Sequence, residues 1–220
     1  MSAEEKYYRQ LDLLRKPIPP VTIIGAGGIG SPVALVLAKM GAERILVYDF
    51  DTIEQHNYPN QMLPESLQTK STVGMKKTEA LQALIYAMTG VVIETADRYT
   101  DQPLSGIVIT ATDSMESRKL VFDKLKYNPE VNLFIDARMS ALSFEVYSCN
   151  PYQTDVWEKA YFPDSESDPL PCTAKSIIFN TFGIAAEVGN VVCRFVNNEP
   201  IPKQIKKGFS NFHYSIGGLA

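Results

Sequence analysis

Residues 21–31, which read Val-Thr-Ile-Ile-Gly-Ala-Gly-Gly-Ile-Gly-Ser, decide the fold of this chain. A short β-branched run leads directly into Gly25-x-Gly27-x-x-Gly30, and the pattern after it predicts a helix over 31–40. In such a loop the first glycine makes the turn, the second lets the backbone approach phosphate oxygens, and the third allows close packing of helix on strand. The free N–H groups at the helix start attract anions. The stretch therefore predicts a nucleotide site, and by itself it does not separate NAD from ATP.

Strand and helix patterns alternate after this loop. Asp49 stands at the end of the next strand, where a carboxylate can accept hydrogen bonds from ribose hydroxyls. The alternation predicts a Rossmann-like α/β fold with a mostly parallel sheet and helices on both faces. A polar loop over 52–75 and a mobile crossover loop near 150–175 interrupt the pattern, and no element is predicted beyond residue 200. The predicted strands are 21–24, 44–48, 91–95, 107–110, 133–136 and 142–149, and the predicted helices are 3–15, 31–40, 76–88, 115–127 and 176–195.

The composition is that of a globular protein. Of the 220 residues, 45% are hydrophobic and 21% charged, so we expect one domain over residues 1–220. No stretch approaches the ~20 apolar residues of a membrane span, and the N-terminus lacks the apolar core of a signal peptide, so a cytoplasmic protein is expected. A formal net charge of −4 disfavours nucleic acid as a partner. The three cysteines form no Cys-x-x-Cys pair, so neither a disulfide framework nor a zinc knuckle is predicted.

The glycine loop is one of several segments that together resemble the ThiF/MoeB/HesA family of adenylating enzymes. The ordered set is far more specific than any one member, and it extends from about residue 6 to about residue 195. The segments are residues 6–10 (KYYRQ), 25–31 (GAGGIGS), 49–54 (DFDTIE), 73–77 (VGMKK) and 111–114 (ATDS), with Asn57 and Gln61 in the family's Asn-x-x-Arg-Gln motif.

The resemblance implies a reaction and a set of partners. The family activates a carboxylate with ATP and Mg²⁺, commonly the C-terminal glycine of a small ubiquitin-like or sulfur-carrier-like protein, and it acts as a homodimer. Such chemistry needs in-line positioning and cations around developing negative charge. By resemblance, Gly25, Gly27, Gly28 and Gly30 form the nucleotide loop, Asp49 holds the ribose, Asn57, Gln61 and Lys77 contact phosphates, Asp113 holds Mg²⁺, and Arg9 reaches the partner subunit's site.

Each assignment has a plainer alternative. Lys77 could be a solvated helix lysine, and Arg9 an ordinary surface arginine. Asp113 could simply cap the helix that follows it. For Asp51, capping its own loop is favoured over a second contact with the nucleotide.

The sequence departs from the family pattern in two respects. Asn60 occupies the place of an arginine, and an amide cannot make the cationic phosphate contact of a guanidinium. Lys70, Lys76 or Arg138 could substitute for it; otherwise activity is reduced, or the chain is a weak scaffold subunit. The usual first Cys-x-x-Cys pair is also missing, since residues 157–163 contain no cysteine, which excludes a four-thiolate zinc site.

The cysteines receive separate interpretations. Cys172 resembles the position where some relatives accept the activated acyl group, and an inert loop cysteine is an equal alternative. Cys149 and Cys193 are interpreted as small buried hydrophobic residues. An NAD-dependent oxidoreductase remains the alternative enzyme, although Lys77 and the Thr112–Asp113 turn do not support it.

Overall fold

The computed structural model describes residues 3–166 and 177–219. Eight strands form one sheet in the order β10-β9-β8-β7-β6-β1-β2-β5, and a separate two-stranded hairpin consists of β3 and β4. The fold class predicted from the sequence is confirmed. The strands are β1 (Val21–Ile24), β2 (Ile45–Tyr48), β3 (Ser66–Leu67), β4 (Lys70–Ser71), β5 (Glu94–Ala96), β6 (Gly106–Thr110), β7 (Val131–Met139), β8 (Ser143–Cys149), β9 (Pro202–Gly208) and β10 (His213–Leu219).

The large sheet has a parallel part and an antiparallel part. Strands β5, β2, β1, β6 and β7 run parallel, whereas β7, β8, β9 and β10 pair antiparallel. From β1 the chain builds outward through β2 to β5, and it then returns to add β6 and β7 on the other side. The strand order therefore reverses between β1 and β6, and ligands of open α/β sheets bind at such a point.

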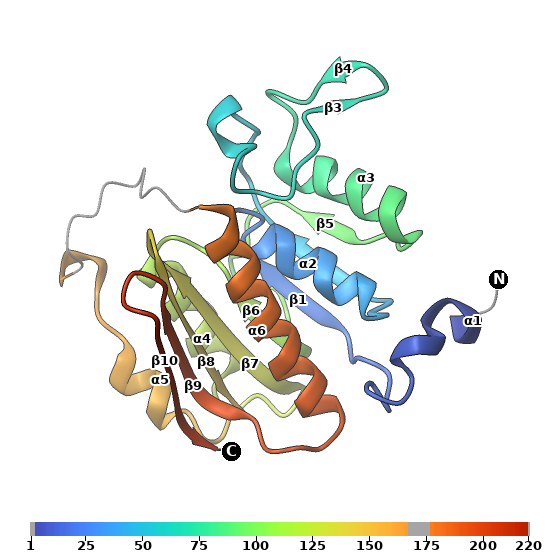
Figure 1. Cartoon of the computed structure of the whole chain (residues 1–220). Helices are drawn as coiled ribbons and strands as arrows, with labels where there is room; N and C mark the ends of the chain where they lie inside the picture. The colour runs from blue at the N-terminus through green and yellow to red at the C-terminus, as the bar shows by residue number, and fades with distance from the viewer. Residues whose placement is uncertain (1–2, 167–176, 220) are drawn as a thin grey trace.

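Helices cover both faces of the sheet, as Figure 1 shows. On one face, α2, α3 and α6 pack on a core that includes Ile23, Leu81 and Ile184. On the other face, α4 and α5 pack on a second core that includes Phe134 and Trp157. The helices are α1 (Ala3–Tyr7), α2 (Gly30–Lys39), α3 (Lys77–Thr89), α4 (Met115–Leu125), α5 (Asp155–Ala160) and α6 (Ile178–Val196), with short 3₁₀ helices η1 (Tyr8–Gln10), η2 (Gln55–Asn57) and η3 (Asp164–Glu166).

The central strands β1 and β6 are mostly apolar runs in the sequence, and their burial explains this pattern. Every residue of β1 and of β6 is buried, because helices cover both faces of these strands. Strands of this kind are continuous apolar runs rather than alternating ones. Gly106 at the start of β6 adopts φ +67°, and a Cβ there would lie 2.2 Å from the Pro20 carbonyl oxygen.

The predicted N-terminal helix over 3–15 is too long. The α-helix ends at Tyr7, and one 3₁₀ turn continues to Gln10. The N–H groups of Leu13 and Leu14 still donate to the Gln10 carbonyl (3.0 and 2.7 Å). The Leu13 carbonyl, however, accepts hydrogen bonds from the side chains of Asn197 (2.7 Å) and Cys193 (3.5 Å) at the end of α6. A contact between residues far apart in the sequence therefore lies where the predicted helix would continue.

The crossover loop predicted near 150–175 contains a helix that the sequence pattern did not predict. Residues 155–160 form α5, and Trp157 is only 2% exposed. Its indole stacks on Phe122 with ring centroids 3.9 Å apart. This segment is packed on the sheet, while residues 167–176 lie outside the described residues.

The region beyond residue 200, for which no element was predicted, forms the hairpin of β9 and β10. In β9 only Pro202 and Ile205 are buried, and lysines occupy several other positions, so the strand lacks a strong apolar signal. Gly217 and Gly218 belong to strand β10. Within the described ranges, we find no helix with the length and apolar character needed to span a membrane.

Candidate active site

The glycine loop joins the end of β1 to the start of α2. Gly25 adopts φ +104°, and a Cβ there would lie 2.6 Å from the Ala111 carbonyl oxygen at the end of β6. A Cβ on Gly30 would lie 1.7 Å from the Gly25 carbonyl oxygen. In contrast, a Cβ on Gly27 would meet no atom within 4 Å. The first and third glycines thus permit close packing, whereas Gly27 and its half-buried neighbour Gly28 leave backbone open to a ligand.

Asp49 connects this loop to strand β2. Its Oδ2 accepts a hydrogen bond from the Ala26 N–H (2.6 Å), and its Oδ1 accepts one from the Asp51 N–H (2.8 Å). Burial raises the pKa of the Asp49 carboxyl, although these hydrogen bonds and the charge of Lys77 oppose the rise. The carboxylate therefore lies against the glycine loop, at the place where ribose recognition was predicted.

Lys77 is not a solvated helix lysine. It is 7% exposed at the start of α3, and its Nζ lies 2.7 Å from Asp51 Oδ2. Its backbone N–H also donates to the Asp51 carbonyl (3.0 Å). The role favoured for Asp51 from the sequence was capping of its own loop. In the described structure the Asp51 carboxylate instead holds the ammonium group of Lys77, beside Asp49.

The segment after η2 is tied to the glycine loop by Ser31. The Ser31 hydroxyl donates to the Gly27 carbonyl (2.7 Å) and accepts from the Met62 N–H (2.9 Å). Asn57 uses its side-chain oxygen locally, accepting from the Glu54 N–H at 2.8 Å. Gln61 Oε1 is buried and has no hydrogen-bond partner among the residues that the structure describes. Of the two predicted amides, Gln61 is thus the one whose buried side-chain oxygen is unused, whereas that of Asn57 is occupied.

Asp113 is exposed in the turn after β6, and it does not cap α4. The cap is Ser114, whose Oγ accepts from the Ser117 N–H (3.1 Å), and Asp164 Oδ1 accepts from the Met115 N–H (2.7 Å). Within the described ranges, the Asp113 carboxylate makes no hydrogen bond or ion pair. Nor do three His, Cys, Asp or Glu side chains converge there as metal ligands. One free carboxylate fits Mg²⁺, which is commonly held by one or two carboxylates together with substrate phosphates.

A buried polar cluster lies beneath this turn, and of its residues only Arg138 was named from the sequence. Asp136 on β7 is completely buried and accepts hydrogen bonds from Thr110 Oγ1 (2.7 Å), Trp157 Nε1 (2.7 Å), Arg138 Nε (2.8 Å) and Arg118 Nη1. Burial by itself would raise the pKa of the Asp136 carboxyl, but the two guanidinium groups and these hydrogen bonds outweigh burial and lower it.

Two sequence signals could have revealed this cluster. Asp136 follows the apolar run over residues 133–135 within the buried part of β7, and Arg118 falls on the buried face of α4 with Met115, Val121 and Phe122. Charged residues at such positions are rarely buried unless they are paired. Arg118 also donates to the carbonyl groups of the turn that precedes Asp113, so the cluster supports the predicted metal site.

Arg9 is remote from the glycine loop of its own chain. Its neighbours Tyr7 and Gln10 donate hydrogen bonds to the Ala38 and Lys39 carbonyls (3.3 and 3.1 Å) at the end of α2. The glycine loop is at the other end of this 10-residue helix, about 15 Å away. Cys172 lies outside the described residues. Cys149 is buried as predicted, and burial raises the pKa of its thiol to about 12. Cys193, which was also predicted to be buried, is only half-buried.

The three cations considered as substitutes for an arginine at position 60 lie in different settings. Lys70 is exposed on the small hairpin strand β4, and Lys76 is exposed and paired with Asp97. Arg138 is half-buried at the end of β7. Asn60 itself faces α6, where its carbonyl accepts from Thr181 Oγ1 at 3.4 Å.

The sequence of the chain is similar to those of several known proteins. The Anopheles gambiae protein "Adenylyltransferase and sulfurtransferase MOCS3" is 35% identical over 111 residues, which are 47% of this chain and 24% of that protein. The "SAMP-activating enzyme E1" of Haloferax volcanii is 27% identical over 115 residues, 49% of this chain and 41% of that protein. The chain thus matches about a quarter of the first relative's length and less than half of the second's.

Solved structures share the fold at low sequence identity. Escherichia coli MccB aligns with TM-score 0.74 and 18% identity, covering 99% of this chain and 70% of that one. The structure of PaaA aligns with TM-score 0.71 and 17% identity, covering 98% and 83%. The ThiF family pattern matches residues 10–214. With the glycine loop, the Asp49 segment, Lys77 and Asp113 gathered around one edge of the sheet, the chain belongs to the ThiF family.

Proposed function

We propose that this protein uses ATP to adenylate a carboxylate, the C-terminal glycine of a small ubiquitin-like protein. The names of its relatives support the reaction, since they are described as adenylyltransferases or as activating enzymes. A 41% identical stretch of 75 residues in the Arabidopsis thaliana "Ubiquitin-like modifier-activating enzyme 5" supports the class of substrate.

One observation carries the proposal. The glycine loop, the Asp49–Asp51–Lys77 contacts and the free Asp113 carboxylate all follow the carboxyl ends of β1, β2 and β6, where the strand order reverses. A triphosphate at this edge would meet the open backbone at Gly27 and the N-terminal N–H groups of α2. Lys77 would supply positive charge on the β2 side of the loop.

The reaction itself requires little covalent work from the protein. A carboxylate oxygen attacks the α-phosphorus, the bond from that phosphorus to the bridging oxygen breaks, and pyrophosphate leaves with the electron pair. Mg²⁺, bound by Asp113 and the phosphates, would neutralise charge on the leaving group. Asp51 holds Lys77 in place before the substrate binds, so little reorganisation is needed.

The proposal includes a homodimer and a second step. The distance of Arg9 from its own glycine loop supports a role at the partner subunit's nucleotide. Transfer of the activated acyl group to the Cys172 thiol would follow adenylation, and it is tested separately by Cys172→Ser, which we expect to block transfer to sulfur and spare pyrophosphate release.

Asn60 favours one competing function, a subunit that binds nucleotide weakly and assists another enzyme. ATP–pyrophosphate exchange separates the two functions, because only an adenylating enzyme returns labelled pyrophosphate to ATP. The assay is run with small ubiquitin-fold proteins that end in diglycine, and with the same proteins lacking the terminal glycine.

A matched pair of variants makes this assay specific. Lys77→Met removes the buried ammonium group and should lower exchange by at least tenfold, as expected for one charge-assisted contact. Lys76→Met removes the adjacent exposed ammonium group, which among the described residues pairs with Asp97, and should leave exchange within about twofold. Exchange that is absent with every carboxylate protein, or that is unaffected by Lys77→Met, would contradict the proposal.

A further inference from the structure

Arg138 at the end of β7 is held in one position on several sides. Its side chain is 13% exposed, its Nε donates to Asp136 Oδ2 (2.8 Å), and its Nη1 donates to the Ala160 carbonyl (2.8 Å). The guanidinium also lies over the ring of Tyr147, 4.5 Å from the centroid. A side chain fixed in this way cannot turn to solvent to satisfy its remaining donors.

One of these donors has no partner. Arg138 Nη2 is buried and makes no hydrogen bond to any residue in the described part of the chain. Buried polar groups almost always find a partner, and those that do not call for an explanation such as an absent ligand. A cationic donor requires an acceptor, and an anionic acceptor suits it best.

The charges around Arg138 favour an anion as well. Arg118 and Arg138 share the single carboxylate of Asp136, and Arg118 also donates to backbone carbonyl groups. Glu145 lies opposite Arg138 in the β7–β8 register, but it pairs with Lys206 at 2.9 Å and accepts from the Tyr147 hydroxyl. The cluster therefore keeps one positive charge that Asp136 does not balance, and the donor without a partner belongs to Arg138.

The register of β6 and β7 shows where Arg138 lies relative to the turn that contains Asp113. Asp136 pairs with Thr110, so Arg138, two residues further along β7, lies level with Thr112 at the carboxyl edge. Strand β7 lies beside β6 on the side away from β1 and its glycine loop. Neighbouring strands are about 4.8 Å apart, so Arg138 flanks the turn of Asp113 across from the glycine loop.

We propose that Arg138 Nη2 binds the carboxylate that is to be adenylated, an inference that rests on the proposed function. With the phosphates at the glycine loop and at Asp113, an in-line attack requires the carboxylate on the far side of the α-phosphorus, which is the β7 side. One carboxylate oxygen accepts from Nη2, and the other forms the new bond to phosphorus while pyrophosphate departs. Arg138 forms no covalent bond, and it orients the nucleophile.

The test measures binding, with N-acetylglycylglycine as the carboxylate probe and its C-terminal amide as the uncharged match. Both are titrated into the full chain by NMR, in the presence of Mg²⁺ and a saturating non-hydrolysable ATP analogue. We expect the acid to bind the wild type at least tenfold more tightly than the amide, and Arg138→Gln to remove this preference. The affinity for the ATP analogue alone should change less than twofold.

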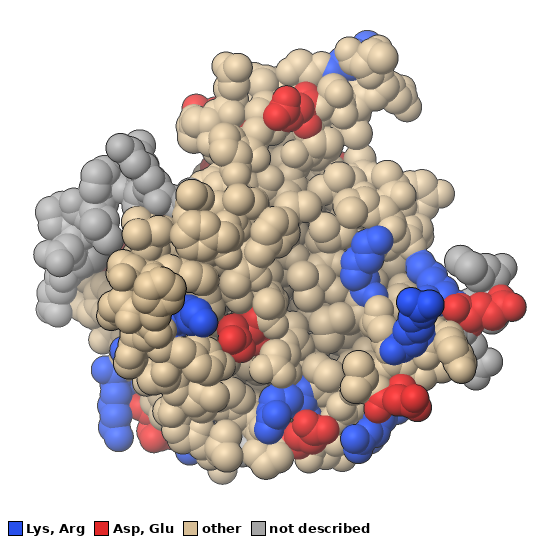
Figure 2. All heavy atoms as spheres, viewed as in Figure 1, with Lys and Arg blue, Asp and Glu red and all other residues tan. Residues whose placement is uncertain are grey.

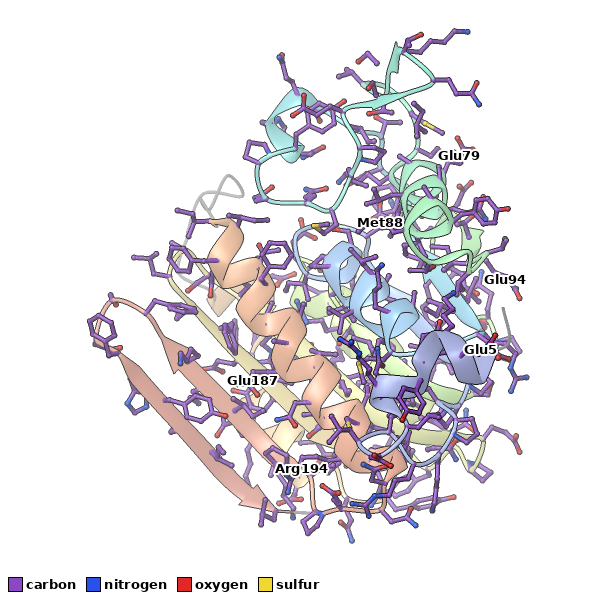
Figure 3. All side chains as sticks on the ribbon, turned by 45° about the vertical axis from the view of Figure 1, so that its right-hand side comes forward. Glu5, Glu79, Met88, Glu94, Glu187 and Arg194 are labelled. Carbon is purple, nitrogen blue, oxygen red and sulfur yellow. The ribbon has the colours of Figure 1, made fainter. Side chains whose placement is uncertain are left out.

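Two further variants keep the outcome clear. Arg194→Gln is the control, because Arg194 lies in the last turn of α6 (Figure 3). In the described structure its side chain donates a hydrogen bond to the Pro200 carbonyl and pairs with Glu199, so this variant should behave as wild type. Arg138→Lys keeps the charge beside Asp136 but lacks Nη2, so it replaces Arg138→Gln if that variant does not fold, and it should also lose the preference for the acid.

Three results would overturn the inference. The first is that the wild type shows no preference for the acid, and the second is that both Arg138 variants keep the preference unchanged. The third is that the Arg138 variants bind the ATP analogue more weakly when no carboxylate probe is present, which would assign Nη2 to a phosphate. Failure of the proposed function has a different signature. In that case the carboxylate binds through Arg138, yet no protein carboxylate supports pyrophosphate exchange.

Discussion

Asp113 and Ser114 are neighbours in the chain with different tasks. Ser114 caps α4, while Asp113 is exposed and bonds to nothing in the described structure. We therefore predict that Asp113→Ala abolishes Mg²⁺-dependent exchange, by a hundredfold or more, because a lost metal ligand costs several kcal/mol in the transition state. The thermal midpoint should stay within about 1 °C of wild type, since the substitution breaks no contact within the protein.

The adjacent serine provides the control for this prediction. Ser114→Ala should lower the free energy of unfolding by about 1 kcal/mol, the usual value of an N-cap, and should leave Mg²⁺ dependence in place. The two effects are measured by chemical denaturation and by exchange at several Mg²⁺ concentrations. If Asp113→Ala destabilised the fold while exchange continued, Asp113 would be a structural residue.

The buried carboxylate of Asp136 makes a pH-dependent contribution to stability. Its pKa is lowered in the folded state, so this contribution is present above the unfolded-state value of 3.8 and is lost as pH falls below that value. Asp136→Asn leaves two arginines without their carboxylate, and at pH 7 it should reduce the free energy of unfolding by about 3–5 kcal/mol. The difference from wild type should narrow below about pH 4.

Denaturation of both proteins between pH 3 and 7 measures this difference. Asp123→Asn is the matched control, because Asp123 is exposed on α4 and pairs only with Lys119, a contact of small value. A difference between Asp136→Asn and wild type that is constant over this range would mean that the lost contacts, and not the charge, account for the destabilisation.

At the scale of the element, the unit of β1, glycine loop and α2 contains two glycines with opposite surroundings. A Cβ on Gly30 meets the Gly25 carbonyl at 1.7 Å, and a Cβ on Gly27 meets nothing within 4 Å. Gly30→Ala should therefore destabilise the fold by about 1–3 kcal/mol or more, as overpacking does. Gly27→Ala should fold normally yet weaken ATP binding at least tenfold, because its methyl group projects where phosphate oxygens approach.

Calorimetric titration with ATP and a thermal melt of each variant test this pair. Normal ATP affinity in a folded Gly27→Ala protein would mean that the phosphates do not approach that side of the loop. A Gly30→Ala protein as stable as wild type would mean that α2 can shift away from β1 at little cost, contrary to the close packing described above.

At the scale of the molecule, the N-terminal segment and the glycine loop lie at opposite ends of α2, as Figures 1 and 3 show. We therefore predict that Arg9 acts on a partner subunit. Arg9→Ala and Asp113→Ala should each be inactive alone, whereas an equal mixture should recover about a quarter of wild-type activity, because half of randomly formed dimers contain one complete site. No recovery, despite subunit exchange seen by native mass spectrometry, would remove the role of Arg9 in trans.

Charges of both signs are mixed on the face that carries α2 and α6. Figure 2 shows acidic and basic side chains interspersed over the face that carries α2 and α6, without a continuous basic area in that view. With a formal net charge of −4, non-specific attraction to phosphate backbones is weak.

The sequence by itself determined the fold class, the family and the order of the motifs around the glycine loop. These follow from local patterns: a buried apolar strand, a glycine turn, and the regular spacing of apolar residues in helices. Asp49 could be named in advance because it stands at the end of a predicted strand, and Lys77 and Asp113 because their segments resemble the family's motifs.

Only the tertiary structure decided the features that depend on contacts between distant segments. Trp157 lies in a helix, and its indole stacks on Phe122 and donates a hydrogen bond to Asp136. Leu13 lies outside the N-terminal helix, and its carbonyl accepts a hydrogen bond from Asn197. The unpaired donor of Arg138 likewise depends on residues from β7, β8 and α5 together. Local propensity differs by fractions of a kcal/mol per residue, so such contacts override it, and the sequence pattern of one segment does not contain them.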